Sequence, residues 1–264
     1  MHIKMGDELK GQRVLVTGGA GFVGSNLVRR LVAEGAEVTI LDDFFTGRME
    51  NLEGIPAESY RLVRGSVTDG ELVWQLVAEA ELIFHLAARN IIASTHNPYE
   101  DFKTNIGGTL NVLLAARNSH PRRVIYTSSV SVYGNPRYLP INEDDRISLL
   151  TPYAVSKYSG EGYCQAFYES YDVPVVVCVI RMSMVPGRTR KTLTAGSWRN
   201  SCSELRKGYR RKFTGTDSKL AILPLWKMLL GQRCRRRFRQ NLMARFSTSG
   251  RGWRPVWKLW LSWC

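Results

Sequence analysis

The chain has 264 residues, 44% of them apolar, so it can bury the core of one large domain or two small ones. No apolar run approaches the 18 residues that a membrane-spanning helix needs, and the polar start MHIKMGDELKGQR is unlike a secretory signal. The five cysteines lack metal-site spacing, and their odd number is typical of free thiols in a reducing compartment. We therefore expect a cytoplasmic protein without membrane association.

The net charge of +14 is divided unevenly along the chain. Residues 1–186 hold 17 Lys and Arg against 21 Asp and Glu, a net charge of −4. Residues 187–264 hold 20 against 2, a net charge of +18, together with six of the seven tryptophans. The two segments are therefore interpreted separately, as a first domain of residues 1–186 and a basic tail of residues 187–264.

Strand and helix patterns alternate through the first segment. Strands are predicted at 13–17, 37–41, 60–63, 82–85, 123–127 and 174–180. Helices are predicted at 22–34, 71–78, 99–118 and 152–171. This alternation predicts βαβ units and an α/β fold, a doubly wound parallel Rossmann sheet with helices on both faces.

A glycine-rich loop joins the first predicted strand to the first predicted helix. Gly18, Gly21 and Gly24 permit a tight turn there, and the helix N-terminus offers free N–H groups to a pyrophosphate. Asp42 follows at the end of the second strand, where a carboxylate binds both ribose hydroxyls and repels a 2′-phosphate. The pattern predicts NAD as the cofactor. Arg48, just downstream, would suit NADP, but a solvated loop arginine is the preferred interpretation.

A second constellation begins the helix predicted at 152–171. Thr151 is a natural N-cap and Pro152 suits the first helical turn. Tyr153 and Lys157 then lie on one helix face, roughly 6 Å apart along the axis. An ammonium near a phenol lowers its pKa from about 10, which would make Tyr153 a general base near neutral pH. Ser129, at the end of a strand, can share the hydrogen bond to the same substrate oxygen.

Five motifs in this order resemble the extended short-chain dehydrogenases/reductases of the NAD-dependent epimerase/dehydratase family, above all the UDP-glucose 4-epimerases. They are TGGAGFVGSN at 17–26, HLAA at 85–88, TNIGGTLNVLLAAR at 104–117, TSSVSVYG at 127–134 and YAVSK at 153–157. The resemblance covers about residues 11–185 and implies catalytic roles for Ser129, Tyr153 and Lys157, with Asn105 as a structural support. The cofactor contacts that it implies, or that adjoin its motifs, are Gly18, Gly21, Phe22, Val23, Gly24, Asp42, Ser66, Val67, Ala87, Ala88, Tyr153 and Lys157.

The resemblance also implies a reaction and partners. Tyr153 would remove the proton of a sugar 4-hydroxyl while tightly bound NAD takes up the hydride, and a 4-keto sugar would turn over before the hydride returns. The substrate would be a nucleotide sugar of the UDP type, and the helices at 99–118 and 152–171 would form a homodimer interface. The enzyme would be a UDP-glucose/UDP-galactose 4-epimerase.

Two departures from the family pattern qualify this reading. Ser66 stands where the family has an aspartate near the adenine, which leaves the adenine contact open. Val130 and Ser131 follow Ser129, where dehydratases and decarboxylases carry acidic residues. This favours epimerisation, with an NDP-sugar 4,6-dehydratase or a UDP-glucuronate decarboxylase as the alternatives.

The tail of residues 187–264 has the amino-acid composition expected when a coding sequence is translated in the wrong reading frame. We can read the third base of each codon together with the first two bases of the next codon. In that frame, codons for residues 213–229 can encode YGDGQQTRDFALVEDV, and codons for residues 246–252 can encode FNVGTG. Both are motifs of the substrate lobe in the resembled family. We therefore hypothesise a frame change near residues 184–188, which the nucleotide sequence through codons 180–190 would test. Turnover would then be weak or absent, because hydride transfer needs the sugar held over the nicotinamide.

Two alternatives of another class follow from the same features. The chain could be a non-catalytic NAD-binding protein, or a nonspecific polyanion binder through its basic tail. Specific nucleic-acid recognition is not expected, because the tail arginines belong to no recognised binding fold. No metal site is expected, and His85 is interpreted as a packing residue at a strand end.

Overall fold

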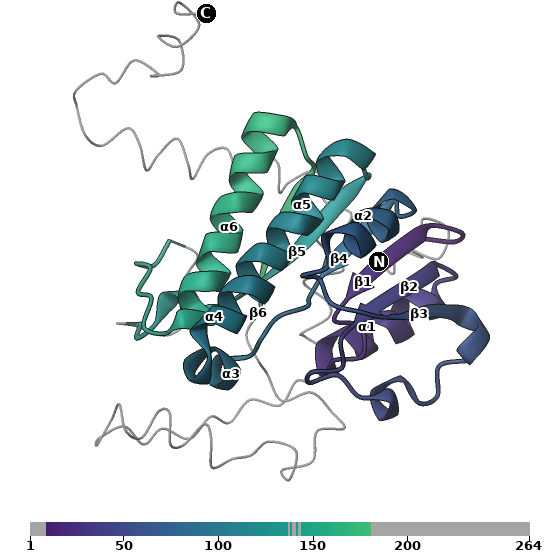
Figure 1. Ribbon diagram of the computed structural model, residues 1–264, viewed down its shortest axis with the longest axis horizontal. Coiled ribbons are helices and arrows are strands. Elements are labelled where there is room, and N and C mark those ends of the chain that lie inside the picture. Colours follow the sequence, from purple (N-terminus) through teal and green to yellow (C-terminus); the bar gives the residue numbers. More distant parts are fainter. Residues whose placement is uncertain (1–8, 137, 139–140, 142–143, 181–264) are drawn as a thin grey trace, which may run out of the picture. The chain divides into compact units, whose positions relative to one another are not determined.

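Six parallel strands form one sheet in the computed structural model, which describes residues 9–136, 138, 141 and 144–180 (Figure 1). The strands are β1 Arg13–Thr17, β2 Glu37–Asp42, β3 Tyr60–Arg64, β4 Leu82–His85, β5 Arg123–Ser129 and β6 Val175–Ile180. Their order in the sheet is β3-β2-β1-β4-β5-β6, so the direction of strand addition reverses between β3 and β4. The predicted doubly wound Rossmann sheet is confirmed.

The reversal puts a topological switch point between β1 and β4. Thr17, the last residue of β1, pairs with Leu41 of β2 and with His85 of β4, so these three strands end at one edge of the sheet. Ligands of open parallel sheets bind outside the carboxyl ends of the strands at such a point. The loops after β1, β2 and β4 therefore meet where a ligand is expected.

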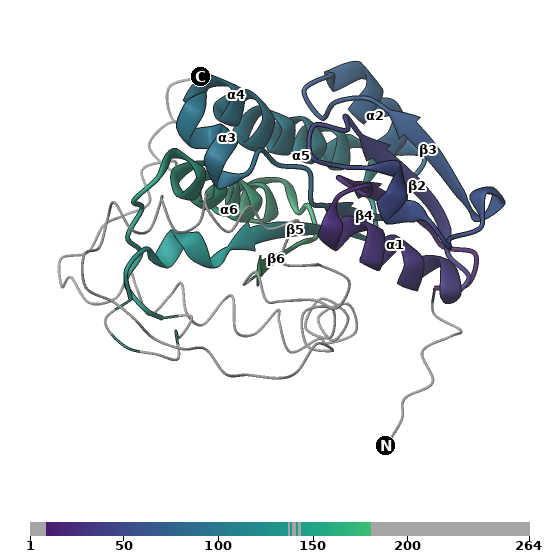
Figure 2. The same cartoon turned by 90° about the horizontal axis from the view of Figure 1, so that it is seen from below.

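Helices cover both faces of the sheet, as Figures 1 and 2 show. Helix α1, Phe22–Ala33, lies on one face, and α2 Gly70–Ala78, α5 Gly108–Ser119 and α6 Pro152–Tyr171 lie on the other. Because β1 is covered on both sides, its consecutive residues Val14, Leu15 and Val16 are all buried. Burying each such side chain contributes about 1.5–3 kcal/mol to folding.

The long helix predicted at 99–118 has a more complex form. It consists of α4 Pro98–Asp101, a π-helical turn Phe102–Gly107 and α5, and it is preceded by the unpredicted short helix α3 Ile91–His96. The side chains of Asn90 and Asn97 accept backbone N–H groups at the starts of α3 and α4, which explains the break between them. Short 3₁₀ turns occur at Met49–Leu52, Ala57–Ser59 and Val130–Tyr133.

The tail of residues 187–264, the domain boundary at 186 and the hypothesised frame change near 184–188 lie outside the described residues, so they stay predictions. Within the part of the chain that the structure describes, no helix has both the length and the apolar character to cross a membrane. In the same part, His, Cys, Asp and Glu side chains nowhere gather in a group of three or more that could hold a metal ion.

Candidate functional site

The glycine loop after β1 is closed by contacts that exclude side chains. Gly18 has a φ of +72°, and a Cβ on it would lie 2.8 Å from the backbone nitrogen of Ala87. A Cβ on Gly24 would overlap the carbonyl oxygen of Gly18. Both positions therefore require glycine, and the loop brings the start of α1 against the first residues after β4.

No side chain caps the N-terminus of α1. Its N-cap is Gly21, and its first turn, from Phe22 through Val23, contains no acidic residue. A twelve-residue helix with an uncapped N-terminus presents N–H groups and a partial positive charge to an anion. This arrangement fits the phosphates of a dinucleotide.

Asp42 ends β2 beside the glycine loop, as the sequence predicts. Its Oδ2 accepts a hydrogen bond from the Ala20 backbone N–H at 2.8 Å, and its Oδ1 accepts one from the Phe44 N–H at 2.8 Å. Burial and the neighbouring charge of Asp43 raise the pKa of Asp42, while these two hydrogen bonds and a third from the Gly21 backbone oppose that rise. A carboxylate has about four lone-pair sites, so after these three backbone hydrogen bonds the fixed carboxylate can still accept a ribose hydroxyl.

The remaining predicted cofactor contacts lie at the same ends of β3 and β4. Ser66 and Val67 follow β3; Val67 is buried, and its carbonyl oxygen accepts from Asn111 Nδ2 at 3.0 Å. Ala87 and Ala88 follow β4 and are partly buried, and Ala87 donates its backbone N–H to Thr17 Oγ1 at 3.2 Å. These contacts fix the backbone of both loops beside the glycine loop.

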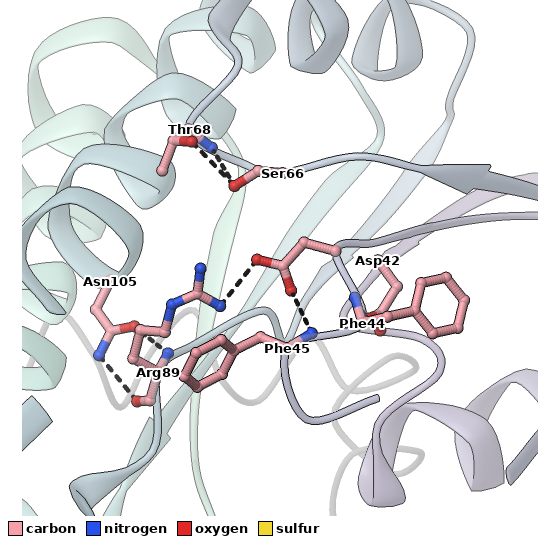
Figure 3. Close-up of polar contacts among 8 residues, drawn as sticks. Asp42, Phe44, Phe45, Ser66, Thr68, Arg89 and Asn105 are labelled. Carbon is pink, nitrogen blue, oxygen red and sulfur yellow. Dashed lines mark hydrogen bonds and ion pairs between the residues drawn. The ribbon is translucent and has the colours of Figure 1, made fainter. Parts of the chain in front are cut away.

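Arg89 links two loops of the site and was missed by sequence reasoning. Its guanidinium forms an ion pair with Asp43 at 2.8 Å and lies 4.0 Å from the ring centroid of Phe45. Asn105 holds the Arg89 backbone, accepting its N–H at 2.7 Å and donating to its carbonyl oxygen at 3.2 Å (Figure 3). The loop after β4 is therefore tied to the loop after β2. The available signal was that Arg89 directly follows the HLAA motif.

A buried carboxylate, also missed from the sequence, joins this loop to α6. Asp101 Oδ1 accepts hydrogen bonds from Ser94 Oγ at 2.5 Å, Asn105 Nδ2 at 2.5 Å and Ser156 Oγ at 3.0 Å. The Ser156 hydroxyl shares its one proton between Asp101 and the carbonyl oxygen of Tyr153, which lies 3.0 Å from Oγ. The network fixes the first turns of α6, which carry Tyr153, and it includes the predicted structural support Asn105. The four-residue spacing of Asp101 and Asn105 was the only local hint.

Tyr153 and Ser129 come together at the carboxyl edge of the sheet. Thr151 caps α6 by accepting the Ala154 N–H at 3.1 Å, and Pro152 occupies the first turn. Burial raises the pKa of Tyr153, a hydrogen bond with Ser129 lowers it, and the charge of Asp101 raises it. The predicted pair therefore meets, although 24 residues separate the two in sequence.

The structure corrects the predicted effect of Lys157 on Tyr153. The prediction that its ammonium lowers the pKa of Tyr153 is wrong for this arrangement, because burial dominates and the net change is upward. Lys157 is itself buried, with Nζ 4.6 Å from the ring centroid of Tyr126 on β5. Burial lowers the pKa of Lys157 to about 8, against the opposing effects of Cys164, Glu161 and Asp101. The lysine therefore titrates much closer to neutrality than a solvated one.

His85 is buried in a defined hydrogen-bond chain, in agreement with its predicted packing role. Its Nδ1 lies 2.8 Å from Thr17 Oγ1, and its Nε2 lies 3.0 Å from Thr109 Oγ1. Thr109 already donates its hydroxyl proton to the Asn105 carbonyl oxygen at 2.6 Å, so His85 Nε2 must be the donor and Nδ1 the acceptor. Burial lowers the pKa of His85 to about 3, which keeps the ring neutral.

The fold and this site define a dinucleotide-binding α/β domain, and comparison with known proteins gives the family. Residues 14–199 match the NAD-dependent epimerase/dehydratase family, and the chain belongs to it. It is 36% identical over 209 residues to a UDP-glucose 4-epimerase of Mycolicibacterium smegmatis, covering 70% of this chain and 67% of that protein. It is 37% identical to UDP-glucuronic acid decarboxylase 1 of Danio rerio, covering 70% of this chain and 46% of that protein.

Solved structures extend the same comparison. The dTDP-glucose 4,6-dehydratase DesIV of Streptomyces venezuelae, crystallised with NAD and TYD bound, is 28% identical, with a TM-score of 0.65. The match covers 73% of this chain and 63% of that one. The chain thus spans about half to two thirds of the relatives it matches. The family predicted from the sequence is confirmed, and it holds epimerases, dehydratases and decarboxylases alike.

Proposed function

We propose that this chain binds NAD at the carboxyl edge of its sheet. The proposal is supported by the glycine loop closed at Gly18 and Gly24, the uncapped start of α1 and the fixed carboxylate of Asp42. The helix start would hold the pyrophosphate, and Asp42 the adenosine ribose. When bound, NAD supplies the redox chemistry by accepting and returning a hydride.

The proposed proton acceptor is Tyr153, and its hydrogen bond with Ser129 is the observation that carries the proposal. That hydrogen bond stabilises the phenolate and holds its oxygen beside Ser129, the last residue of β5. The Ser94, Asp101 and Ser156 network holds the helix turn from which Tyr153 projects. Tyr153 is therefore already positioned for proton transfer, and because burial raises its pKa, the Ser129 hydrogen bond is needed to favour the phenolate that accepts the proton.

We propose a nucleotide-sugar 4-epimerase of the UDP-glucose/UDP-galactose type as the specific activity. Val130 and Ser131 follow Ser129 in the short 3₁₀ turn, and the Ser131 hydroxyl lies 2.9 Å from Ser129 Oγ. The sequence thus places no carboxylate directly after Ser129 to protonate a leaving hydroxyl, as dehydration of the sugar would require. The relatives that are dehydratases and decarboxylases make those two reactions the competing candidates.

Two measurements on the purified full chain test this proposal. Calorimetry with NAD should show saturable binding, and product analysis with UDP-glucose should show UDP-galactose. Release of a 4-keto-6-deoxy sugar from dTDP-glucose, or of a UDP-pentose from UDP-glucuronate, would replace the epimerase assignment. NAD binding without any conversion would support the alternative of a non-catalytic NAD-binding protein.

We also propose a homodimer, built on α4, the π-helical turn and α6. These elements contact one another and lie side by side in both views (Figures 1 and 2). They expose the large apolar or aromatic side chains of Tyr99, Phe102, Val155 and Tyr158. Exposed apolar side chains grouped on neighbouring helices are typical of a protein–protein contact surface.

A further inference from the structure

We propose that Ser66 donates a hydrogen bond to the purine base in the proposed dinucleotide site. The chain would therefore accept hypoxanthine as readily as adenine at that position. The inference rests on the proposed NAD site and adds a specificity to it.

The order of the strands places the base over the end of β3. The glycine loop follows β1, Asp42 ends β2, and β3 is the next strand outward. With the phosphates at the loop and the ribose at Asp42, the base continues in the same direction. Adjacent strands lie about 4.8 Å apart, so a purine attached to that ribose reaches the end of β3. There the Gly65 N–H donates to the Asp42 carbonyl oxygen at 3.0 Å, which holds the start of the loop that carries Ser66 beside Asp42.

The Ser66 hydroxyl has already used its accepting capacity. Its Oγ accepts from the Thr68 backbone N–H at 3.2 Å and from the Thr68 hydroxyl at 2.9 Å (Figure 3). A serine hydroxyl has two lone pairs and one proton, so only the proton remains available. Towards a ligand, Ser66 is therefore a donor, whereas an aspartate at this position would be an acceptor.

This difference selects another atom on the same edge of the base. The six-position edge of adenine carries a donor, the N6 amino group, and an acceptor, N1. Hypoxanthine replaces the amino group with an oxygen acceptor. A carboxylate at residue 66 would require the amino group, but the Ser66 proton pairs with adenine N1 or with hypoxanthine O6. Ser66 thus offers no hydrogen bond that depends on the amino group.

The test compares two dinucleotides by isothermal titration calorimetry on the purified full chain. The probes are NAD and nicotinamide hypoxanthine dinucleotide, which differ only at position 6 of the purine. We expect the two dissociation constants of the wild-type chain to agree within about threefold, since the hydrogen bond from Ser66 does not distinguish them. In Ser66→Asp, NAD should bind at least about tenfold more tightly than the hypoxanthine dinucleotide, because a charged acceptor then meets the amino group.

Two further variants separate the hydrogen-bond argument from a general effect. Thr68→Val removes one donor to Ser66 and frees a lone pair, so the preference should move towards NAD by a smaller factor than in Ser66→Asp. Ser59→Asp adds the same charge just before β3, at the opposite end of that strand, and should leave the ratio of the two constants unchanged.

The outcomes are distinguishable. A wild-type chain that prefers NAD about tenfold or more, or a Ser66→Asp ratio equal to that of the wild type, overturns the role of Ser66 and leaves NAD binding standing. If neither dinucleotide binds, the proposed function fails, and the base specificity fails with it.

Discussion

His85 should make the folded domain sensitive to mild acid, because the structure has no place for a proton on its ring. Protonation would add a hydrogen to Nδ1, facing Thr17 Oγ1. That oxygen already accepts from the backbone N–H groups of Leu86 and Ala87, both at 3.2 Å, so neither of its lone pairs is free. A charged ring would be buried without an acceptor, close to the positive charge of Lys157.

The size of the change in unfolding free energy follows from the linkage between folding and protonation of His85. The ordinary pKa of His85 is 6.5, and in the folded state it is lowered to about 3. The unfolded chain therefore binds the proton more readily, and the stabilisation, fully present above pH 6.5, is lost as the pH falls towards 3. Going from about pH 7 to about pH 4.5 should cost about 2.5 kcal/mol of unfolding free energy from this one residue.

The assay is urea denaturation of the wild-type chain and His85→Gln at those two pH values, followed by far-ultraviolet circular dichroism. At neutral pH the variant should be less stable by about 1–3 kcal/mol, because its amide replaces the two ring contacts imperfectly. At the acidic pH that gap should shrink by about 2.5 kcal/mol or reverse, since glutamine does not titrate. His96→Gln, at an exposed position on α3, serves as the control and should show no such change. A gap of the same size at both pH values would refute this role of His85.

Three other changes test the proposed site and surface. Tyr153→Phe should lower epimerase turnover by about 10²-fold or more while calorimetry shows NAD binding close to that of the wild type, since only the proton acceptor is lost; unchanged turnover would remove Tyr153 from the chemistry. Gly18→Ala should abolish measurable NAD binding, because the new Cβ meets the Ala87 backbone at a φ of +72°; calorimetry showing wild-type affinity would contradict the loop assignment. Phe102→Glu should shift the sedimentation coefficient from dimer to monomer, with the exposed Trp74→Glu of α2 as a matched control, and equal dissociation in both variants would argue against the proposed interface.

Much of the fold and part of the candidate site follow from local sequence. Each of the six strands lies within a residue or two of its predicted range, because β-branched and aliphatic runs between turns leave few other ways to bury them. The glycine spacing predicts the loop after β1, and the Thr151–Pro152 pair predicts the start of α6. These features depend on residues within one or two helical turns of each other.

Tertiary structure decided which groups meet across the fold and how their charges are solvated. The sequence placed Tyr153 and Lys157 on one helix face, but the packing of α6 on β5 buries the lysine against Tyr126 and raises, rather than lowers, the pKa of Tyr153. The Arg89–Asp43 ion pair joins residues 46 positions apart and exists only because β2 and β4 flank β1. The periodicity of the sequence indicates only which residues are neighbours on one helix or strand. Desolvation and long-range pairing depend on which elements pack together, and that is fixed by the order of the strands.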